Sequence, residues 1–222
     1  MLQRQLEPEV MDSPEDASDY DAMDHAKVNR RFANDLVAQG KLAGEVLDLG
    51  VGTAQIPIEI CTLCADCHLL GVDLAENMLQ LGRRRVAAEG LGDRILLELQ
   101  DAKRLPYANH RFDAVISNSI VHHVPEPERV FAEAIRVVTG NGLLFFRDLL
   151  RPADEPTLRQ LVATYAGGEP AHARQMFEGS LWAALTVDEV RAIVVGLRFG
   201  EETVEATSDR HWTWIARANA RR

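Results

Sequence analysis

Two glycines, Gly50 and Gly52, follow directly on an apolar run that ends at Leu49. A glycine carries no Cβ, so a turn that contains two of them can bend sharply and bring backbone amides against a ligand. An acid, Asp48, stands two residues before the first glycine. This pattern suits recognition of a small ligand by the backbone beside a carboxylate. By itself, a Gly-x-Gly turn is equally typical of an ordinary link between a strand and a helix.

Two further acids stand at the ends of the next two apolar runs. Asp73 ends the second run, where a carboxylate can accept hydrogen bonds from both hydroxyls of a ribose. Asp101 follows the third run, where a carboxylate can accept from an adenine amino group. The alternative for each is a solvated loop acid. Three such features after three successive strands favour a ligand that contains adenosine.

The glycine turn also separates two kinds of adenosine cofactor. A nicotinamide-binding turn has a third small residue, as Gly-x-Gly-x-x-Gly, and holds a pyrophosphate at the helix N-terminus. Here the small residue Ala54 comes one position early. The acid Asp48 suits an ammonium group better than two phosphates, and S-adenosylmethionine (SAM) carries an ammonium, a sulfonium and no phosphate. The residues favour SAM, and a nicotinamide-dependent oxidoreductase remains the alternative.

Short apolar runs alternate with amphipathic stretches from Glu45 onward, which predicts the sheet that would bring these residues together. The predicted strands are Val46–Leu49, His68–Val72, Ile95–Leu99, Phe112–Ser117 and Leu143–Arg147. The predicted helices between them cover about 54–64, 75–89 and 127–139. Regular alternation predicts a doubly wound α/β fold with a parallel sheet, which binds ligands at the carboxyl ends of its strands.

The two ends of the chain have different patterns. Helical spacing predicts one helix over about 20–39, and residues 152–182 predict helices joined at Gly167-Gly168. A capping box at Thr186 opens a helix to about Leu197, and two strands, 203–207 and 211–216, follow as an antiparallel pair. We expect one domain over 1–222. Its parts are an N-terminal arm and helix (1–42), a cofactor-binding core (43–151), a helical cover (152–185) and a C-terminal helix with a strand pair (186–222).

Four segments in combination resemble the class I SAM-dependent methyltransferases, especially the small-molecule group that includes quinone-biosynthesis C-methyltransferases. The segments are Leu47–Ala54, Gly71–Leu79, Gln100–Ala102 and Phe112–Asn118. The resemblance runs from about Val46 to Arg151 and departs at Ala54, where the family most often has glycine. It implies a Rossmann-like sheet of seven strands, mostly parallel with the last antiparallel, and methyl transfer from SAM.

The resemblance also implies which residues contact the cofactor. Gly50, Gly52 and Thr53 would line its methionine end, Asp73 would hold the ribose, and Asn118 would face the amino group through its backbone carbonyl. Tyr20 lies on the arm that commonly covers SAM in this family, and its ring can attract a sulfonium by cation–π interaction; a helix staple is an equal alternative for it. The complete set is Tyr20, Asp48, Gly50, Gly52, Thr53, Asp73, Leu74, Met78, Asp101, Ala102 and Asn118.

His122 and His123 follow the fourth strand, near the expected position of the methyl group. Methyl transfer from a sulfonium is an in-line displacement, so the protein mainly aligns a nucleophile and excludes water. A general base is needed only where the nucleophile loses a proton. Either histidine is therefore a candidate base or substrate contact, and a helix-start or packing role is an open alternative. Arg147 and Asp148 either reach the substrate pocket or form structural ion pairs.

Three cysteines, Cys61, Cys64 and Cys67, precede His68 in a spacing that resembles haem-attachment or zinc-binding patterns. The segment runs from a predicted core helix into a predicted core strand, and free cysteine is among the most buried residue types. A packing role is therefore favoured, and no metal site is expected.

The chain has 222 residues, a net charge of −10 and a sequence pI of about 5.2. A nucleic-acid partner is disfavoured because affinity for phosphates requires a basic surface, and the motif after the fourth strand, Ser117–Ile120, lacks the Pro-Pro-aromatic pattern of base-amine methyltransferases. No membrane-spanning stretch or signal peptide is visible, so we expect a cytoplasmic protein with a small-molecule acceptor. The acceptor and the oligomeric state stay open, as does a SAM-binding regulatory protein that has lost catalysis.

Overall fold

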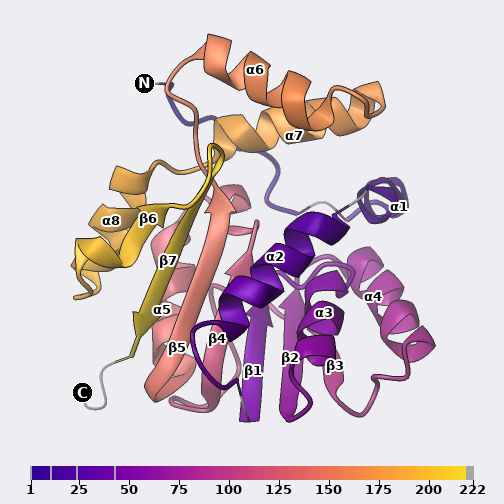
Figure 1. Ribbon diagram of the computed structural model, residues 1–222, viewed down its shortest axis with the longest axis vertical. Coiled ribbons are helices and arrows are strands. Elements are labelled where there is room, and N and C mark those ends of the chain that lie inside the picture. The colour runs from indigo at the N-terminus through magenta and orange to yellow at the C-terminus, as the bar shows by residue number, and fades with distance from the viewer. Residues whose placement is uncertain (1, 11, 24, 43, 219–222) are drawn as a thin grey trace.

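A seven-stranded sheet forms the centre of the computed structural model, which describes residues 2–10, 12–23, 25–42 and 44–218 (Figure 1). The strands stand in the order β3-β2-β1-β4-β5-β7-β6. Their bounds are β1 Gly44–Leu49, β2 Cys67–Asp73, β3 Ile95–Leu99, β4 Phe112–Asn118, β5 Val138–Leu149, β6 Val204–Ala206 and β7 His211–Arg217. Every predicted strand is present, and β5 begins at Val138 rather than at Leu143.

The first five strands run parallel, because β1 pairs with β2 and β4, β2 with β3, and β4 with β5 in parallel registers. Strand β7 runs antiparallel to both β5 and β6. The carboxyl ends of the five parallel strands therefore meet at one edge of the sheet. The strand order reverses between β1 and β4, and such a switch point is where doubly wound sheets bind ligands. The predicted fold class is confirmed.

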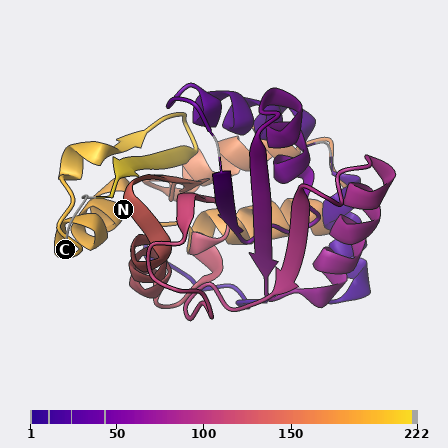
Figure 2. The ribbon, with the colours of Figure 1, turned by 90° about the horizontal axis from the view of Figure 1, so that it is seen from below.

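Successive residues of β1 belong to two different cores, as expected for a sheet covered on both faces. Val46 packs in a cluster with Phe32 and Leu36, whereas Leu47 packs in a second cluster with Phe131 and Trp214. Figure 2 shows helices on both sides of the sheet. The first cluster includes residues of α2 Ala26–Val37, α3 Gln55–Leu63 and α4 Glu76–Ala88, and the second includes residues of α5 Pro127–Val137 and α8 Val187–Gly196.

The N-terminal stretch forms two helices, α1 Pro14–Ala22 and α2, so the prediction of one helix over 20–39 is wrong. The two helices separate because they pack on different partners. In α1, Ala17 packs with Ala75 and Met78 at the start of α4. In α2, Phe32 and Leu36 are buried in the first core cluster. Each helix therefore follows its own packing partners, and α2 begins at Ala26.

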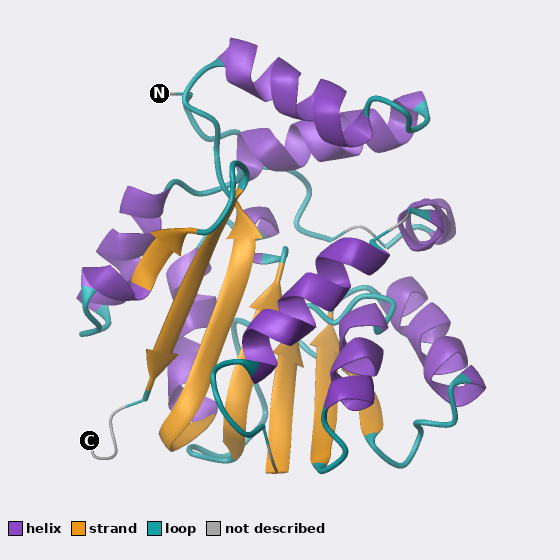
Figure 3. Ribbon diagram, in the orientation of Figure 1, coloured by secondary structure: helices purple, strands orange, loops and turns teal. Residues whose placement is uncertain are grey.

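Two helices, α6 Glu155–Ala166 and α7 Ala171–Ala183, lie above the carboxyl ends of the parallel strands (Figure 3). They match the helices predicted on either side of Gly167-Gly168. The predicted capping box is also present: the Thr186 hydroxyl accepts from the Glu189 amide, and the Glu189 carboxylate accepts from the Thr186 amide. Short 3-10 turns, η1 Val121–His123 and η2 Glu201–Thr203, complete the elements. Among the described residues, no helix is long and apolar enough to cross a bilayer.

Candidate active site

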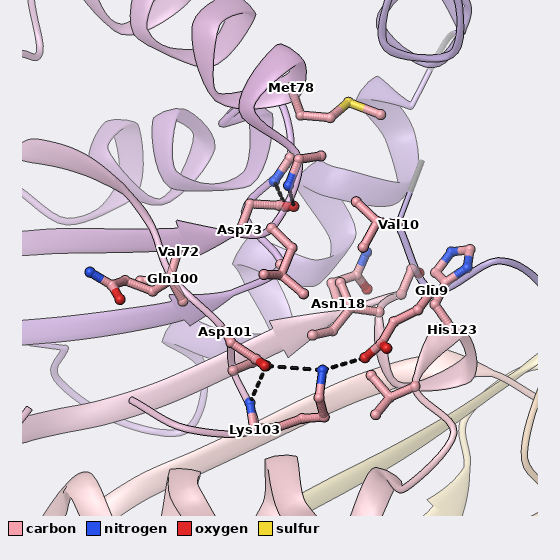
Figure 4. Close-up of a pocket in the computed structure, with 18 of the residues that line it drawn as sticks. Glu9, Val10, Val72, Asp73, Met78, Gln100, Asp101, Lys103, Asn118 and His123 are labelled. Carbon is pink, nitrogen blue, oxygen red and sulfur yellow. Dashed lines mark hydrogen bonds and ion pairs between the residues drawn. The ribbon is translucent and has the colours of Figure 1, made fainter. Parts of the chain in front are cut away.

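A pocket opens at the carboxyl ends of β1, β2 and β4 (Figure 4). Its wall combines the N-terminal arm, the glycine turn, the residues after β2 and β3, and the loop after β4. Of the predicted site residues it is lined by Tyr20, Gly50, Gly52, Asp73, Leu74, Met78, Asp101, Ala102, Asn118 and His123. Unpredicted residues on the same wall are Glu9, Val10, Val72, Ala75, Gln100, Lys103, Ser119, Ile120 and Val124.

The glycine turn adopts backbone conformations that favour glycine. Gly50 has a φ of +74° and Gly52 a φ of +53°, both in the left-handed region. A Cβ built on Gly50 would lie 1.8 Å from Ile120 Cγ2, so this position has neither the conformation nor the space for a side chain. Around Gly52 the nearest such contact is the Tyr20 ring at 4.0 Å, which leaves room for a ligand to approach the backbone.

Asp73 is placed at the end of β2 by its own hydrogen bonds. One carboxylate oxygen accepts from the Gly52 amide at 2.8 Å and the other from the Ala75 amide at 2.9 Å. Burial raises the pKa of Asp73, although these backbone amides oppose the shift. Each carboxylate oxygen has a second lone pair, so Asp73 can still accept hydrogen bonds from two hydroxyl groups of a ligand.

Asp48 and Thr53 do not line the pocket, because both are buried behind its wall with only 2% of their surface exposed. Burial raises the pKa of Asp48 well above its usual range, and the charge of Asp73 raises it further. A buried carboxylate in this position favours a nearby positive charge, which a ligand's ammonium group can supply. A carboxylate at this position thus fits the predicted recognition of an ammonium group, and Asp48 would attract that group from behind the glycine turn.

An ion-paired bridge connects the arm to the loop after β3, as the dashed lines in Figure 4 show. The Lys103 ammonium pairs with the Glu9 carboxylate and lies 3.0 Å from the Asp101 carboxylate. Asp101 also accepts from the Lys103 amide at 2.8 Å. Nothing in the local sequence pattern marks Glu9, which is 94 positions from its partner; Lys103 could have been suspected from its place two residues after Asp101.

The ring of Tyr20 and the side chains of Leu74 and Met78 give the pocket its apolar part. Tyr20 packs near Met78 and Ala75, so α1 holds it over the start of α4. Burial, followed by the negative charge of Asp73, raises the pKa of Tyr20 to about 12. The phenol therefore stays neutral at physiological pH and presents an uncharged aromatic ring.

The two histidines of η1 have different surroundings. His123 lines the pocket, whereas His122 is buried outside its lining and its Nδ1 lies 2.5 Å from the Asp148 carboxylate. Burial, followed by the neighbouring His122, lowers the pKa of His123 to about 3, so this imidazole is neutral at pH 7. Asp148 and Arg147 do not line the pocket; Arg147 instead pairs with Asp35 at 2.8 Å.

The cysteines lie at the opposite end of β2 from the pocket, and all three are free thiols. Cys61 and Cys67 are buried, and the Cys64 thiol donates to the Leu42 carbonyl at 2.7 Å. The Arg94 guanidinium donates to the carbonyls of Cys61 and Cys67. These contacts are those of packed core residues, in agreement with the favoured interpretation.

The geometry fits an adenosyl amino acid. A glycine turn without side chains, a strand-end carboxylate with free lone pairs and an apolar wall surround one pocket at the switch point of a doubly wound sheet. Such a site defines a Rossmann-like enzyme that binds a nucleoside-containing cofactor.

Comparison with known proteins identifies the family. Residues 47–146 match the family model of a methyltransferase domain. The chain is 30% identical over 205 residues to malonyl-[acyl-carrier protein] O-methyltransferase of Geobacter sulfurreducens, which covers 87% of this chain and 72% of that protein. It is 31% identical over 142 residues to demethylmenaquinone methyltransferase of Symbiobacterium thermophilum. The chain belongs to the class I SAM-dependent methyltransferases, and SAM is the cofactor of that family.

A solved structure agrees with this fold. A crystal structure of a SAM-dependent methyltransferase from Methanococcus maripaludis superposes with a TM-score of 0.73 at 12% identity, over 100% of this chain and 99% of that one. The chain spans only about half the length of the curated demethylmenaquinone methyltransferases that it matches. The match covers 57% of the Symbiobacterium thermophilum protein and 49% of a Bacteroides fragilis relative. Shared fold and family therefore say less about the acceptor than about the cofactor.

Proposed function

We propose that this protein transfers a methyl group from SAM to a small-molecule acceptor that enters the pocket beneath α6 and α7. The observation that carries the proposal is the convergence of the glycine turn, Asp73 and Asp101 on one pocket. When bound there, SAM supplies a methyl group activated by a sulfonium. The division of the chain into arm, core, cover and C-terminal part, and its cytoplasmic location, belong to this proposal.

The residues around the pocket have separate binding roles. Asp73 accepts hydrogen bonds from the ribose hydroxyls, since its two oxygens keep free lone pairs beside the Gly52 and Ala75 amides. Leu74 and Met78 pack on the adenine, and Asp101 with Ala102 lies at its edge. The Asn118 carbonyl and the buried Asp48 carboxylate attract the ammonium. Gly50 and Gly52 hold the methionine end, and Thr53 supports their turn from behind the pocket wall.

The acceptor end of the pocket lies next to His123 and Tyr20. Because methyl transfer is an in-line displacement with a good leaving group, these side chains mainly position the acceptor and exclude water. His123 is a contact for the acceptor, and His122 is a positioning residue because it does not line the pocket. The neutral Tyr20 ring favours the sulfonium by cation–π attraction.

A small molecule is the acceptor class that the charge and the relatives support. The net charge of −10 disfavours nucleic acid. One relative is named for a demethylated menaquinone and another for a malonyl group on a carrier protein. Both names describe methyl transfer to a metabolic acceptor rather than to a nucleic acid.

Two binding experiments test the proposal. Calorimetry should detect stoichiometric binding of SAM and S-adenosylhomocysteine, because the pocket matches their shared adenosyl amino acid. Thermal-shift screening should show stabilisation by S-adenosylhomocysteine. Stabilisation by NAD(H) or NADP(H) without any response to SAM would overturn the assignment in favour of an oxidoreductase. Transfer of a labelled methyl group to any acceptor would exclude the non-catalytic regulatory alternative.

A further inference from the structure

A carboxylate and two imidazoles from distant parts of the chain meet beside the pocket. Glu7 belongs to the N-terminal arm, and His122 and His123 form the end of η1. Taking one donor atom from each residue, all three donor atoms lie within 4.8 Å of one another. No other group of three His, Cys, Asp or Glu side chains converges in this way among the described residues. This cluster is separate from the residues that hold the cofactor.

The atoms of the cluster that could bind a metal form no hydrogen bonds with one another. Nδ1 of His123 is fully buried and has no hydrogen-bond partner among the described residues. It lies 3.5 Å from the Glu7 carboxylate, a separation at the outer limit of a hydrogen bond. Two donors on a tetrahedral ion with bonds of about 2.0–2.1 Å stand roughly 3.4 Å apart. The separation therefore matches two ligands of one ion.

A carboxylate holds one ring nitrogen of His122, as is usual for histidines that bind metals in proteins. Its Nδ1 lies 2.5 Å from Asp148, and the same carboxylate accepts from the Val121 and His122 amides. A carboxylate with that many donors stays charged and fixes the Nδ1–H tautomer of the imidazole, so the Nε2 lone pair is free to bind. Histidine ligands of metals almost always donate their other N–H to such a group.

The surrounding structure also makes room for Glu7. Its carboxylate accepts from the Ser180 hydroxyl at 3.0 Å. A Cβ at Gly179 would lie 2.3 Å from the Glu7 carboxylate, which explains a glycine inside α7, where it costs about 1 kcal/mol relative to alanine. Arg4 anchors the arm by donating to the carbonyls of His122, Val124 and Ala183. The site is thus built by packing rather than by a chance approach of exposed side chains.

We propose that Glu7, His122 and His123 bind a divalent transition-metal ion of the zinc type, with Asp148 supporting His122. Two imidazoles and one carboxylate are the ligand set of several zinc sites that keep an open coordination position. His123 also lines the pocket, so the open position lies at the acceptor end. An acceptor oxygen can occupy it, and this last point rests on the proposed function, whereas metal binding itself does not.

Cobalt(II) is the probe that tests the site, because it replaces zinc and its absorption spectrum reports its ligands. After treatment with a chelator, the protein should bind one equivalent of Co²⁺ and show only weak d–d bands, as nitrogen and oxygen ligands give. Glu7→Gln and His123→Gln should each weaken binding at least ~10-fold, and Asp148→Asn should weaken it ~10–100-fold. Glu7→Gln keeps the acceptor for Ser180, so it is the least disruptive of the three variants.

A matched control is His172→Gln, which removes an imidazole of α7 that is half exposed and lies outside the cluster. It should leave cobalt affinity unchanged. The proposal is overturned if no Co²⁺ binds, if neither Glu7→Gln nor His123→Gln weakens binding, or if intense thiolate charge-transfer bands appear and Cys64→Ser abolishes them. Calorimetry with S-adenosylhomocysteine on the same metal-free samples tests the cofactor site separately, so failure of one site is distinguishable from failure of the other.

Discussion

The carboxyl edge of the sheet buries an acid near the end of β1 and another near the end of β5, but it surrounds the two acids differently. At the β5 end, Asp148 is completely buried and accepts hydrogen bonds from the Val121, His122 and Leu149 amides and from the His122 ring. Burial by itself would raise its pKa, but the interactions with the His122 imidazole and with the backbone amides outweigh burial and lower it. At the β1 end, burial and the charge of Asp73 raise the pKa of Asp48.

The difference separates an acid that the protein stabilises from an acid that a ligand must stabilise. The partners of Asp148 all belong to the chain, so this carboxylate supports the structure of η1 and β5. Asp48 has a like-charged neighbour, so its charge costs free energy until a cation binds. Natural proteins tolerate such local conflicts mainly at functional sites. The contrast therefore marks the β1–β2 end as the ligand-binding half of the edge.

The largest expected effect is loss of stability at the β5 end. Asp148→Ala removes the acceptor for the backbone amides and for the His122 N–H, which leaves several buried donors unpaired. We expect the free energy of unfolding to fall by about 3–5 kcal/mol. Urea denaturation with a chelator present measures this without a contribution from bound metal. A loss below about 1 kcal/mol would show that the structural role of Asp148 is wrong.

The next effect concerns affinity at the β2 end. Asp73→Asn replaces one acceptor oxygen by a donor amide, so it cannot accept from both ribose hydroxyls. We expect calorimetry to show S-adenosylhomocysteine affinity reduced by about 10–100-fold, since hydrogen bonds to charged groups contribute about 1.5–3 kcal/mol. Asp113→Asn, at the amino end of β4 and outside the pocket, is the matched control and should not change affinity.

The sequence predicted those features of the carboxyl edge that are encoded by residues close together in the chain. Gly50 and Gly52 are identified by the apolar run before them, and Asp73 and Asp101 by their positions after two strands. The alternation of β1 predicts two cores because side chains of a strand point to opposite faces in turn. The sheet follows from these local patterns and from the preference of parallel strands for helical crossovers.

The contributions of the arm could not be predicted in the same way. Glu9 meets Lys103 and Glu7 meets His123 only because the arm passes beneath α7, which depends on contacts such as Gln5 with Trp182. Helical spacing also missed the division between α1 and α2, since the two helices pack in different clusters whose other members are far away in the sequence. Long-range packing decided these features, and no local pattern encodes it.

A smaller and opposite effect on stability is expected at the β1 end. Asp48→Asn removes a buried charge beside Asp73, so we expect the ligand-free protein to gain roughly 0.5–2 kcal/mol of stability and to bind S-adenosylhomocysteine more weakly. An acid whose folded pKa is raised contributes stability that is complete below its unfolded pKa, near 3.9, and is lost as pH rises through the folded pKa.

The gain from Asp48→Asn should therefore be small near pH ~5 and larger near pH ~8, as the wild-type carboxylate ionises. Urea denaturation of both proteins at the two pH values measures the difference. Destabilisation at the higher pH would mean that the Asp48 charge is already compensated within the chain, and the contrast with Asp148 would then disappear.

The smallest expected effect lies at the bridge that joins the arm to the ligand-binding half. Glu9→Gln removes the charge that pairs with Lys103, and such partly exposed pairs contribute about 0.2–1 kcal/mol. S-adenosylhomocysteine affinity should fall by no more than about 5-fold, and the difference from wild type should shrink at high salt because salt screens the pair. Glu155→Gln, which breaks an exposed pair with Arg159 on α6, is the control and should not change affinity. A loss greater than about 10-fold from Glu9→Gln would mean that the arm, and not only the sheet edge, supplies binding energy for the cofactor.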